Sequence, residues 1–110
     1  MLQNALKVEA ALNKARTNHT LIFHEWVNAD HTCGCTVGTA MLALGADIRI
    51  FLRGDHESEM EKFCYALRLK PSEAALEAVL EVSHLHESGK VDEAIDRMVG
   101  VMKDFGLTSD

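Results

Sequence analysis

The most constraining feature of this sequence is the helical spacing of apolar residues near its C-terminal end. Between residues 91 and 105, apolar side chains recur every three or four positions, which is the period of one helix face. Gly106 follows the last of them and is expected to end the helix. The apolar face consists of Val91, Ala94, Ile95, Met98, Val101, Met102 and Phe105.

A second helix is predicted directly before this one. Pro71 suits the first position of a helix, and the apolar residues that follow mark a broad stripe. The stripe consists of Ala75, Leu76, Val79, Leu80 and Val82. Only a short connection at Gly89 separates the two helices. A connection of this length predicts that they pack as an antiparallel helical hairpin.

Three further helices are expected. One spans residues 2–16, one carries the apolar residues between positions 37 and 44, and one follows the capping box formed by Ser58 and Glu61. Thr32 is a candidate cap for the second of these, and Gly45 is placed to end it. We therefore expect a mainly α fold, a compact bundle of about five helices in which residues 1–110 form a single domain.

Two segments leave an alternative open. Residues 47–53 alternate apolar and polar side chains, as a half-buried strand does, and residues 20–27 are their only plausible partner. A short two-stranded ribbon could therefore accompany the helices, although two strands alone are marginal in water. Residues 20–27 also read as an irregular segment, and residues 47–53 also read as helix.

Composition narrows the class of protein. The formal net charge is -6, and no basic cluster is present, so direct binding to nucleic acid is not expected. No apolar run is long enough to cross a bilayer, and the N-terminus lacks the apolar core of a signal peptide. The three cysteines are an odd number, which favours free thiols in a reducing compartment. We expect a cytoplasmic protein that does not enter the membrane.

The loop before residue 36 concentrates the reactive side chains. His24, His31, Cys33 and Cys35 are candidate zinc ligands, although the Cys-x-Cys spacing is tighter than in most structural zinc sites. A thiol at the start of a helix could instead serve redox or nucleophilic chemistry. The third interpretation is structural: Cys35 points into the core near Trp26, a core anchor, and Cys33 faces water.

Two other features of the sequence affect packing. Gly34 and Gly38 leave the start of the following helix bare, so that another segment can approach it closely. His84 and His86 fall near a helix end, where imidazole complements the helix dipole, and both are expected at the surface. No phosphate-binding loop, dinucleotide fingerprint or His-Glu-x-x-His motif is present.

One group of proteins resembles much of the chain. The resemblance covers about residues 20–100 and is to small uncharacterised bacterial and phage proteins. Their pattern implies a buried helix opening at the second cysteine and a later Glu-Ala helix, but no activity. Here the two cysteines are closer together, and Ala40 stands where a Trp is usual. The matching positions are Phe23, Trp26, Cys33-Gly34, Cys35-x-x-Gly38 and residues 67–74, LRLKPSEA.

A second resemblance concerns zinc. Cys35-x-Val37-Gly38, followed by a helix and by the Gly89 to Ala94 segment, is similar to the chemoreceptor zinc-binding domain. That family binds zinc through three His and this Cys, which implies a ligand role for Cys35. Two of the family's His lie on one helix, and the corresponding residues 72–82 contain no His.

The function predicted from the sequence is binding rather than catalysis. We expect a small protein that binds another macromolecule, such as a phage or mobile-element accessory protein or an inhibitor of a host system. The acidic ridge of Glu73, Glu77 and Glu81 is the candidate surface for a protein partner. No catalytic residue or cofactor is assigned, and a homo-oligomer stays open. The alternative is a zinc- or thiol-based sensor at the Cys33/Cys35 loop.

Overall fold

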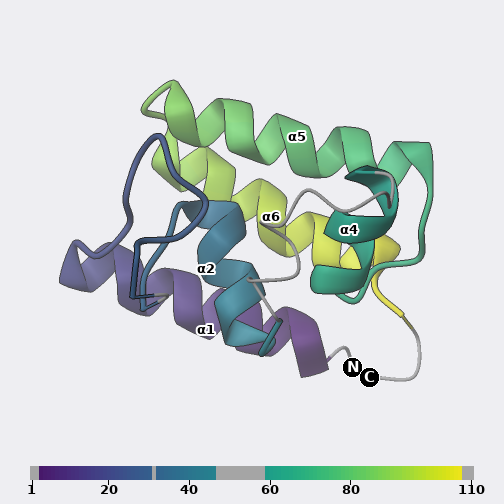
Figure 1. The fold of residues 1–110 in the computed structure, drawn as a ribbon, viewed down its shortest axis with the longest axis horizontal. Helices are drawn as coiled ribbons and strands as arrows, with labels where there is room; N and C mark the ends of the chain where they lie inside the picture. Colours follow the sequence, from purple (N-terminus) through teal and green to yellow (C-terminus); the bar gives the residue numbers. More distant parts are fainter. Residues whose placement is uncertain (1–2, 31, 47–58, 108–110) are drawn as a thin grey trace.

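The computed structural model describes residues 3–30, 32–46 and 59–107 (Figure 1). Within these ranges the chain forms helices and almost no extended structure, which confirms the mainly α class and a bundle of about five helices. The helices are α1 (Gln3–Asn18), α2 (Thr36–Ala43), α4 (Glu59–Ala66), α5 (Glu73–Glu87) and α6 (Val91–Phe105). The predicted segment 47–53 and Ser58 of the predicted capping box lie outside the described residues.

The C-terminal hairpin has the form that the sequence predicts. Helices α5 and α6 lie side by side and antiparallel, and Gly89 joins them with a φ of 84°, a conformation that glycine adopts without strain (Figure 1). Most of the two predicted stripes lies in the core, where Val79, Val82 and Met98 are fully buried. Leu80 was predicted in the same stripe but is exposed, because it lies on the outer face of α5. The predicted place of Pro71 is wrong by two residues. Helix α5 begins at Glu73, because the hydroxyl oxygen of Ser72 accepts a hydrogen bond from the amide of Ala75 and caps the helix (3.0 Å).

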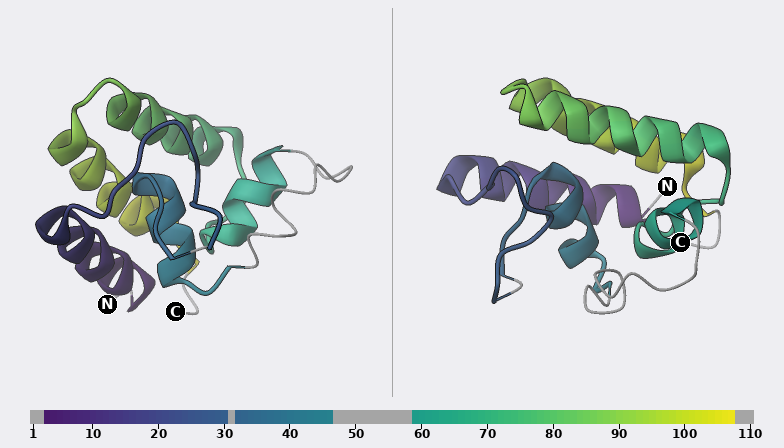
Figure 2. Two further views of the ribbon diagram at one scale, coloured as in Figure 1. Left: turned by 60° about the vertical axis from the view of Figure 1, so that its left-hand side comes forward. Right: turned by 45° about the horizontal axis from the view of Figure 1, so that its top comes forward.

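Helix α2 occupies the centre of the bundle. It packs against α1 on one side and against α5 and α6 on the other, as the views in Figure 2 show. All of its first six residues are buried, and Val37 and Met41 are fully excluded from solvent. Gly45, with a φ of 71°, follows the helix as predicted. This short helix is the element around which α1, α5 and α6 pack.

Arg68 ties the far end of the bundle together. Its guanidinium donates to the buried side-chain oxygen of Asn4 on α1 (3.0 Å) and to the backbone carbonyl of Leu44 after α2 (2.8 Å). Its own carbonyl accepts a hydrogen bond from the amide of Leu107, beyond α6 (3.1 Å). A single residue that follows α4 therefore connects three other parts of the fold.

Residues 20–27 are an irregular segment, one of the two forms predicted for them. Their single β-type contact is an isolated antiparallel bridge between Val27 and Gly34. The segment leaves α1 at His19, whose φ of 57° turns the chain away from the helix axis. It then rises to the C-terminal end of α5 and returns over the start of α2 (Figure 1).

Candidate functional site

The candidate site is built where residues 22–27 cross the start of α2. A Cβ atom added to Gly38 would lie 1.6 Å from the carbonyl oxygen of Trp26, and one added to Gly34 would lie 2.3 Å from it. The close approach predicted from these two glycines is therefore confirmed. The segment that approaches α2 here is the one that carries Trp26. The amide of Cys35 donates to the same Trp26 carbonyl (3.2 Å), which holds the crossing in place.

The turn beyond the crossing is held by an Asn side chain. The side-chain oxygen of Asn28 accepts hydrogen bonds from the amides of Thr32 (2.8 Å) and Cys33 (3.1 Å). Thr32 therefore belongs to this turn and does not cap α2 as expected. The cap is Cys35, whose sulfur accepts from the amide of Gly38 (3.4 Å). The sulfur of Cys35 thus occupies the place of the oxygen in an ordinary Ser or Asp cap.

Cys35 is buried, and its environment keeps the thiol protonated. Only 3% of the residue is exposed, which confirms that it points into the core and that Cys33, half-buried, is the more accessible of the two. Burial raises the pKa of the Cys35 thiol, and the Glu87 carboxylate raises it further, against the amides of Gly38 and Val37 that lower it. A thiol of raised pKa is a poor nucleophile at neutral pH.

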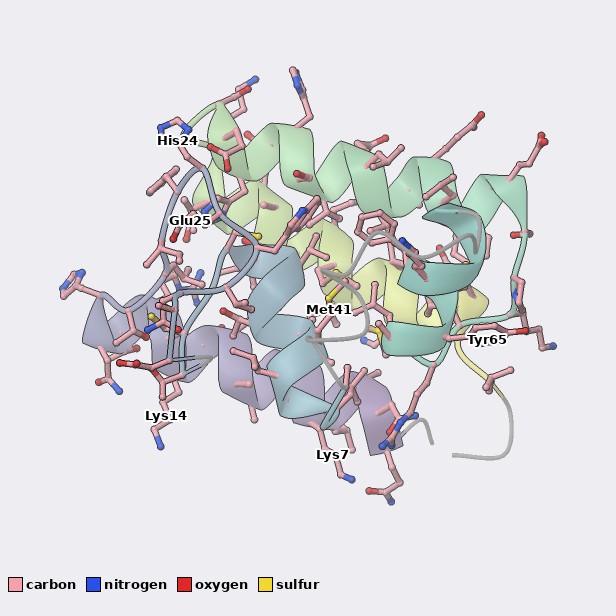
Figure 3. The ribbon with its side chains drawn as sticks, viewed as in Figure 1. Lys7, Lys14, His24, Glu25, Met41 and Tyr65 are labelled. Atoms are coloured by element: carbon pink, nitrogen blue, oxygen red, sulfur yellow. The ribbon has the colours of Figure 1, made fainter. Side chains whose placement is uncertain are left out.

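A pocket of about 200 Å³ opens at this crossing. Glu87 at the end of α5 fixes one wall, because one carboxylate oxygen accepts from the backbone amide of His24 (2.8 Å) and the other lies 3.3 Å from His24 Nδ1. Figure 3 shows His24 and Glu25 on the segment beside this end of α5. The φ of His24 is 69°, a left-handed conformation that is uncommon for residues other than glycine. The lining residues are His24, Glu25, Trp26, Cys35, Ser83 and Glu87.

His86 locks the segment to the helices and corrects the sequence prediction. It was expected at the surface with His84, but it is fully buried, whereas His84 is exposed. Its Nε2 donates to the carbonyl of Ile22 (2.7 Å), because a carbonyl can only accept, and its Nδ1 faces the hydroxyl of Thr36 at 2.7 Å. The ring of Phe23 packs on the imidazole with the ring centres 4.5 Å apart. The burial of His86 could have been predicted from its position, because it lies four residues after Val82 on the same buried helix face as Val79.

The predicted zinc ligands do not gather at one place in the described structure. His24 and Cys35 line the same pocket, whereas Cys33 lines a separate hollow between α1 and α2 that also includes Lys14. His31 lies outside the described residues. Among the residues that the structure describes, no group of three or more His, Cys, Asp or Glu is arranged to hold a metal ion. Glu25, Ser83 and Glu87 complete the pocket and were not predicted.

The acidic ridge lies on the outer face of α5. Glu73, Glu77 and Glu81 are all exposed, and so is Leu80, 40% of which is accessible to solvent. Glu81 forms an ion pair with Arg97 of the neighbouring α6, with 3.1 Å between its carboxylate and Nε. The ridge therefore has two carboxylates directed to solvent beside an exposed leucine, and a third that is shared with α6.

Comparisons with protein-family models, with curated proteins and with solved structures give no match. The helices seen in the described ranges include none of the length and apolar character needed to cross a bilayer.

Proposed function

We propose that the protein acts by binding a basic protein partner through the outer face of α5, defined as Glu73, Glu77, Leu80 and Glu81. The observation that carries this proposal is the exposed Leu80, which has Glu77 one turn before it and Glu81 directly after it. An apolar centre with a polar rim is the usual arrangement of a protein interface. The helical spacing of these residues suits a partner that lies along the helix.

The overall charge supports the same kind of partner. With a formal net charge of -6, the protein attracts basic surfaces and repels nucleic acid. Acidic residues at the rim of an interface mainly raise the rate of association, and their effect weakens as salt screens them. Binding to the proposed partner should therefore depend strongly on ionic strength.

The test uses a photo-crosslinking amino acid at position 80 in cells that naturally make the protein. The expected result is a discrete crosslinked protein with a basic surface, absent when the same group is placed at Lys7, an exposed residue of α1 on the far side of the bundle (Figure 3). Reversing Glu73 and Glu77 to Lys should remove the crosslink. Glu81 is left unchanged in this variant because it pairs with Arg97.

A matched variant separates the site from the overall charge. Asp96→Lys with Asp104→Lys makes the same change of charge at exposed positions of α6 and should leave the crosslink in place. A crosslink that is lost equally in both charge-reversed variants, or that survives reversal of Glu73 and Glu77, would show that the outer face of α5 is only a solvated helix surface.

The sensor alternative stays a prediction of its own. The presence of His24 and Cys35 at one pocket favours it, whereas the raised pKa of the Cys35 thiol works against a resting thiolate. Elemental analysis of the purified protein, with and without chelator, tests the zinc version directly. A role in a phage or mobile element, inhibition of a host system, self-association and a cytoplasmic location also stay predictions.

A further inference from the structure

The pocket lies along the edge of the proposed interface. Ser83 and Glu87, which form one of its walls, follow Leu80 on α5 by about one and two turns. Leu80 and Glu87 are seven positions apart on the helix, a distance of roughly 10 Å along the axis. A partner that lies along α5 and covers Leu80 therefore reaches the mouth of the pocket with side chains two helical turns further on.

The lining of the pocket suits a cation. Glu25 and Glu87 both line it and come from two different parts of the chain, and the C-terminal end of α5 adds partial negative charge there. The carboxylate of Glu87 is fixed by the backbone amide of His24 (2.8 Å), so its position is set before any ligand arrives. Trp26 lines the same space, and an aromatic face attracts a guanidinium or ammonium group.

The start of α2 does not turn the pocket into an anion site. The amide of Gly38, which would otherwise point at an anion, donates to the sulfur of Cys35. The amide of Cys35 itself is taken by the carbonyl of Trp26. The His24 side chain is 87% exposed, so its ring can leave the Glu87 carboxylate when a stronger cation replaces it.

We propose that this pocket binds a basic side chain of the partner, and that the residue it favours is arginine. This inference rests on the proposed function, since it names the group of the partner that the site recognises. A guanidinium is planar, stacks on an indole and donates hydrogen bonds to a carboxylate in pairs, whereas a lysine ammonium is a hydrated point charge. Ser83 also lines the pocket, and its hydroxyl can accept a further hydrogen bond.

The test needs no partner. Trp26 is the only tryptophan and lines the pocket, so all the tryptophan fluorescence comes from this residue. The protein is titrated with N-acetyl-arginine amide, with the matching lysine amide, and with N-acetyl-citrulline amide, which has the shape of arginine without its charge. The expected result is a saturable change with the arginine probe, a weaker one with lysine, and none with citrulline.

Two variants assign the response to the carboxylates. Glu25→Gln and Glu87→Gln should each weaken the arginine probe by about two- to tenfold, the range for one partly exposed charged hydrogen bond. Asp104→Asn, an exposed carboxylate of α6 outside the pocket, should leave binding unchanged. Glu25→Gln is the decisive variant if Glu87→Gln alters the fold, because Glu87 also holds His24.

Equal responses to arginine and citrulline, or a response that survives both Gln variants, would overturn the proposal. So would saturation by zinc at micromolar concentration with no response to the arginine probe, which would make the pocket a metal site. A failed arginine titration with an intact crosslink from position 80 would leave the interface standing and remove only the pocket from it. A lost crosslink with a normal titration would remove the interface on α5 and leave the pocket as an arginine site.

Discussion

Replacing Gly38 by Ala tests the crossing on which the fold and the pocket both depend. The added Cβ would lie 1.6 Å from the carbonyl oxygen of Trp26, where ordinary contacts begin at 3.4 Å. The obstacle is backbone, which cannot rotate away as a side chain does. Residues 22–27 must therefore retreat from α2 by roughly 2 Å to restore a normal contact.

The retreat breaks the hydrogen bonds that hold the segment down. The amide of Cys35 donates to Trp26 (3.2 Å), that of Ile22 to Gly34 (3.0 Å), and that of Asn28 to Cys33 (2.9 Å). At about 1–1.5 kcal/mol each, their loss costs about 3–4.5 kcal/mol. The better helix propensity of Ala returns up to about 1 kcal/mol, which leaves a net loss of about 2–3.5 kcal/mol. The melting temperature should fall by roughly 8–14 °C, at about 4 °C per kcal/mol.

Urea unfolding followed by circular dichroism measures this loss, and Gly100→Ala is the matched control. Gly100 lies inside α6, and a Cβ there would have no neighbour within 4 Å among the described atoms. This control should gain about 0.5–1 kcal/mol because the change only improves helix propensity. If Gly38→Ala lost less than about 1 kcal/mol while the control behaved as expected, the close approach to Trp26 would be refuted.

Three further outcomes follow from buried groups. His86→Phe keeps an aromatic ring but leaves the Thr36 hydroxyl and the Ile22 carbonyl without their hydrogen-bond partner, so the free energy of unfolding in urea should fall by about 2–4 kcal/mol. A fall below about 1 kcal/mol would contradict the two hydrogen bonds of His86. Burial raises the pKa of the Cys35 and Cys64 thiols, so the folded protein keeps these protons at pH values where the unfolded chain loses them. The free energy of unfolding should therefore be constant below about pH 8 and fall as pH rises above about 8.5, by up to about 1.4 kcal/mol per pH unit for each thiol. The fall should be smaller in Cys35→Ala. A free energy of unfolding that stays constant up to about pH 9.5 would contradict the raised pKa values. Iodoacetamide should modify the half-buried Cys33 well before Cys35 or Cys64 in timed mass spectra, and equal rates would show that Cys35 is accessible.

The helices could be predicted because their causes are local. The spacing of apolar residues in α6, the turn at Gly89 and the end of α2 at Gly45 are each written in a few neighbouring residues, and the structure has all three. The starts of helices were less predictable. Pro71 and Thr32 are both good residues for a helix start, but Ser72 and Cys35 make the capping bonds. Several residues near each start can cap, and the packing of the whole bundle decides which one does.

The long-range polar contacts could not be predicted in the same way. Glu87 meets His24 across 63 positions of sequence, and Arg68 meets Asn4 across 64. Nothing in the spacing of these residues marks them, because an exposed helix face also carries Glu and Arg. The approach of a segment to Gly34 and Gly38 was visible as bare backbone, whereas the identity of that segment depends on how α1 and α5 are placed. The sequence therefore indicated where a site could form but not its full lining.

The crossing at Gly38 also determines the shape of the pocket, so Gly38→Ala should affect binding of the arginine probe as well as stability. His24, Glu25 and Trp26 lie on the segment that Gly38→Ala displaces, whereas Ser83 and Glu87 stay on α5. A shift of roughly 2 Å between two walls of a small pocket separates the carboxylates of Glu25 and Glu87, and a guanidinium cannot then contact both. In protein that is still folded, well below its melting temperature, Gly38→Ala should therefore weaken the arginine probe by more than either Gln variant alone. Gly100→Ala should bind the probe normally. If Gly38→Ala were destabilised as expected but bound the probe like the wild type, the probe would be bound without Glu25 and Trp26. The pocket would then have to be assigned to α5 alone.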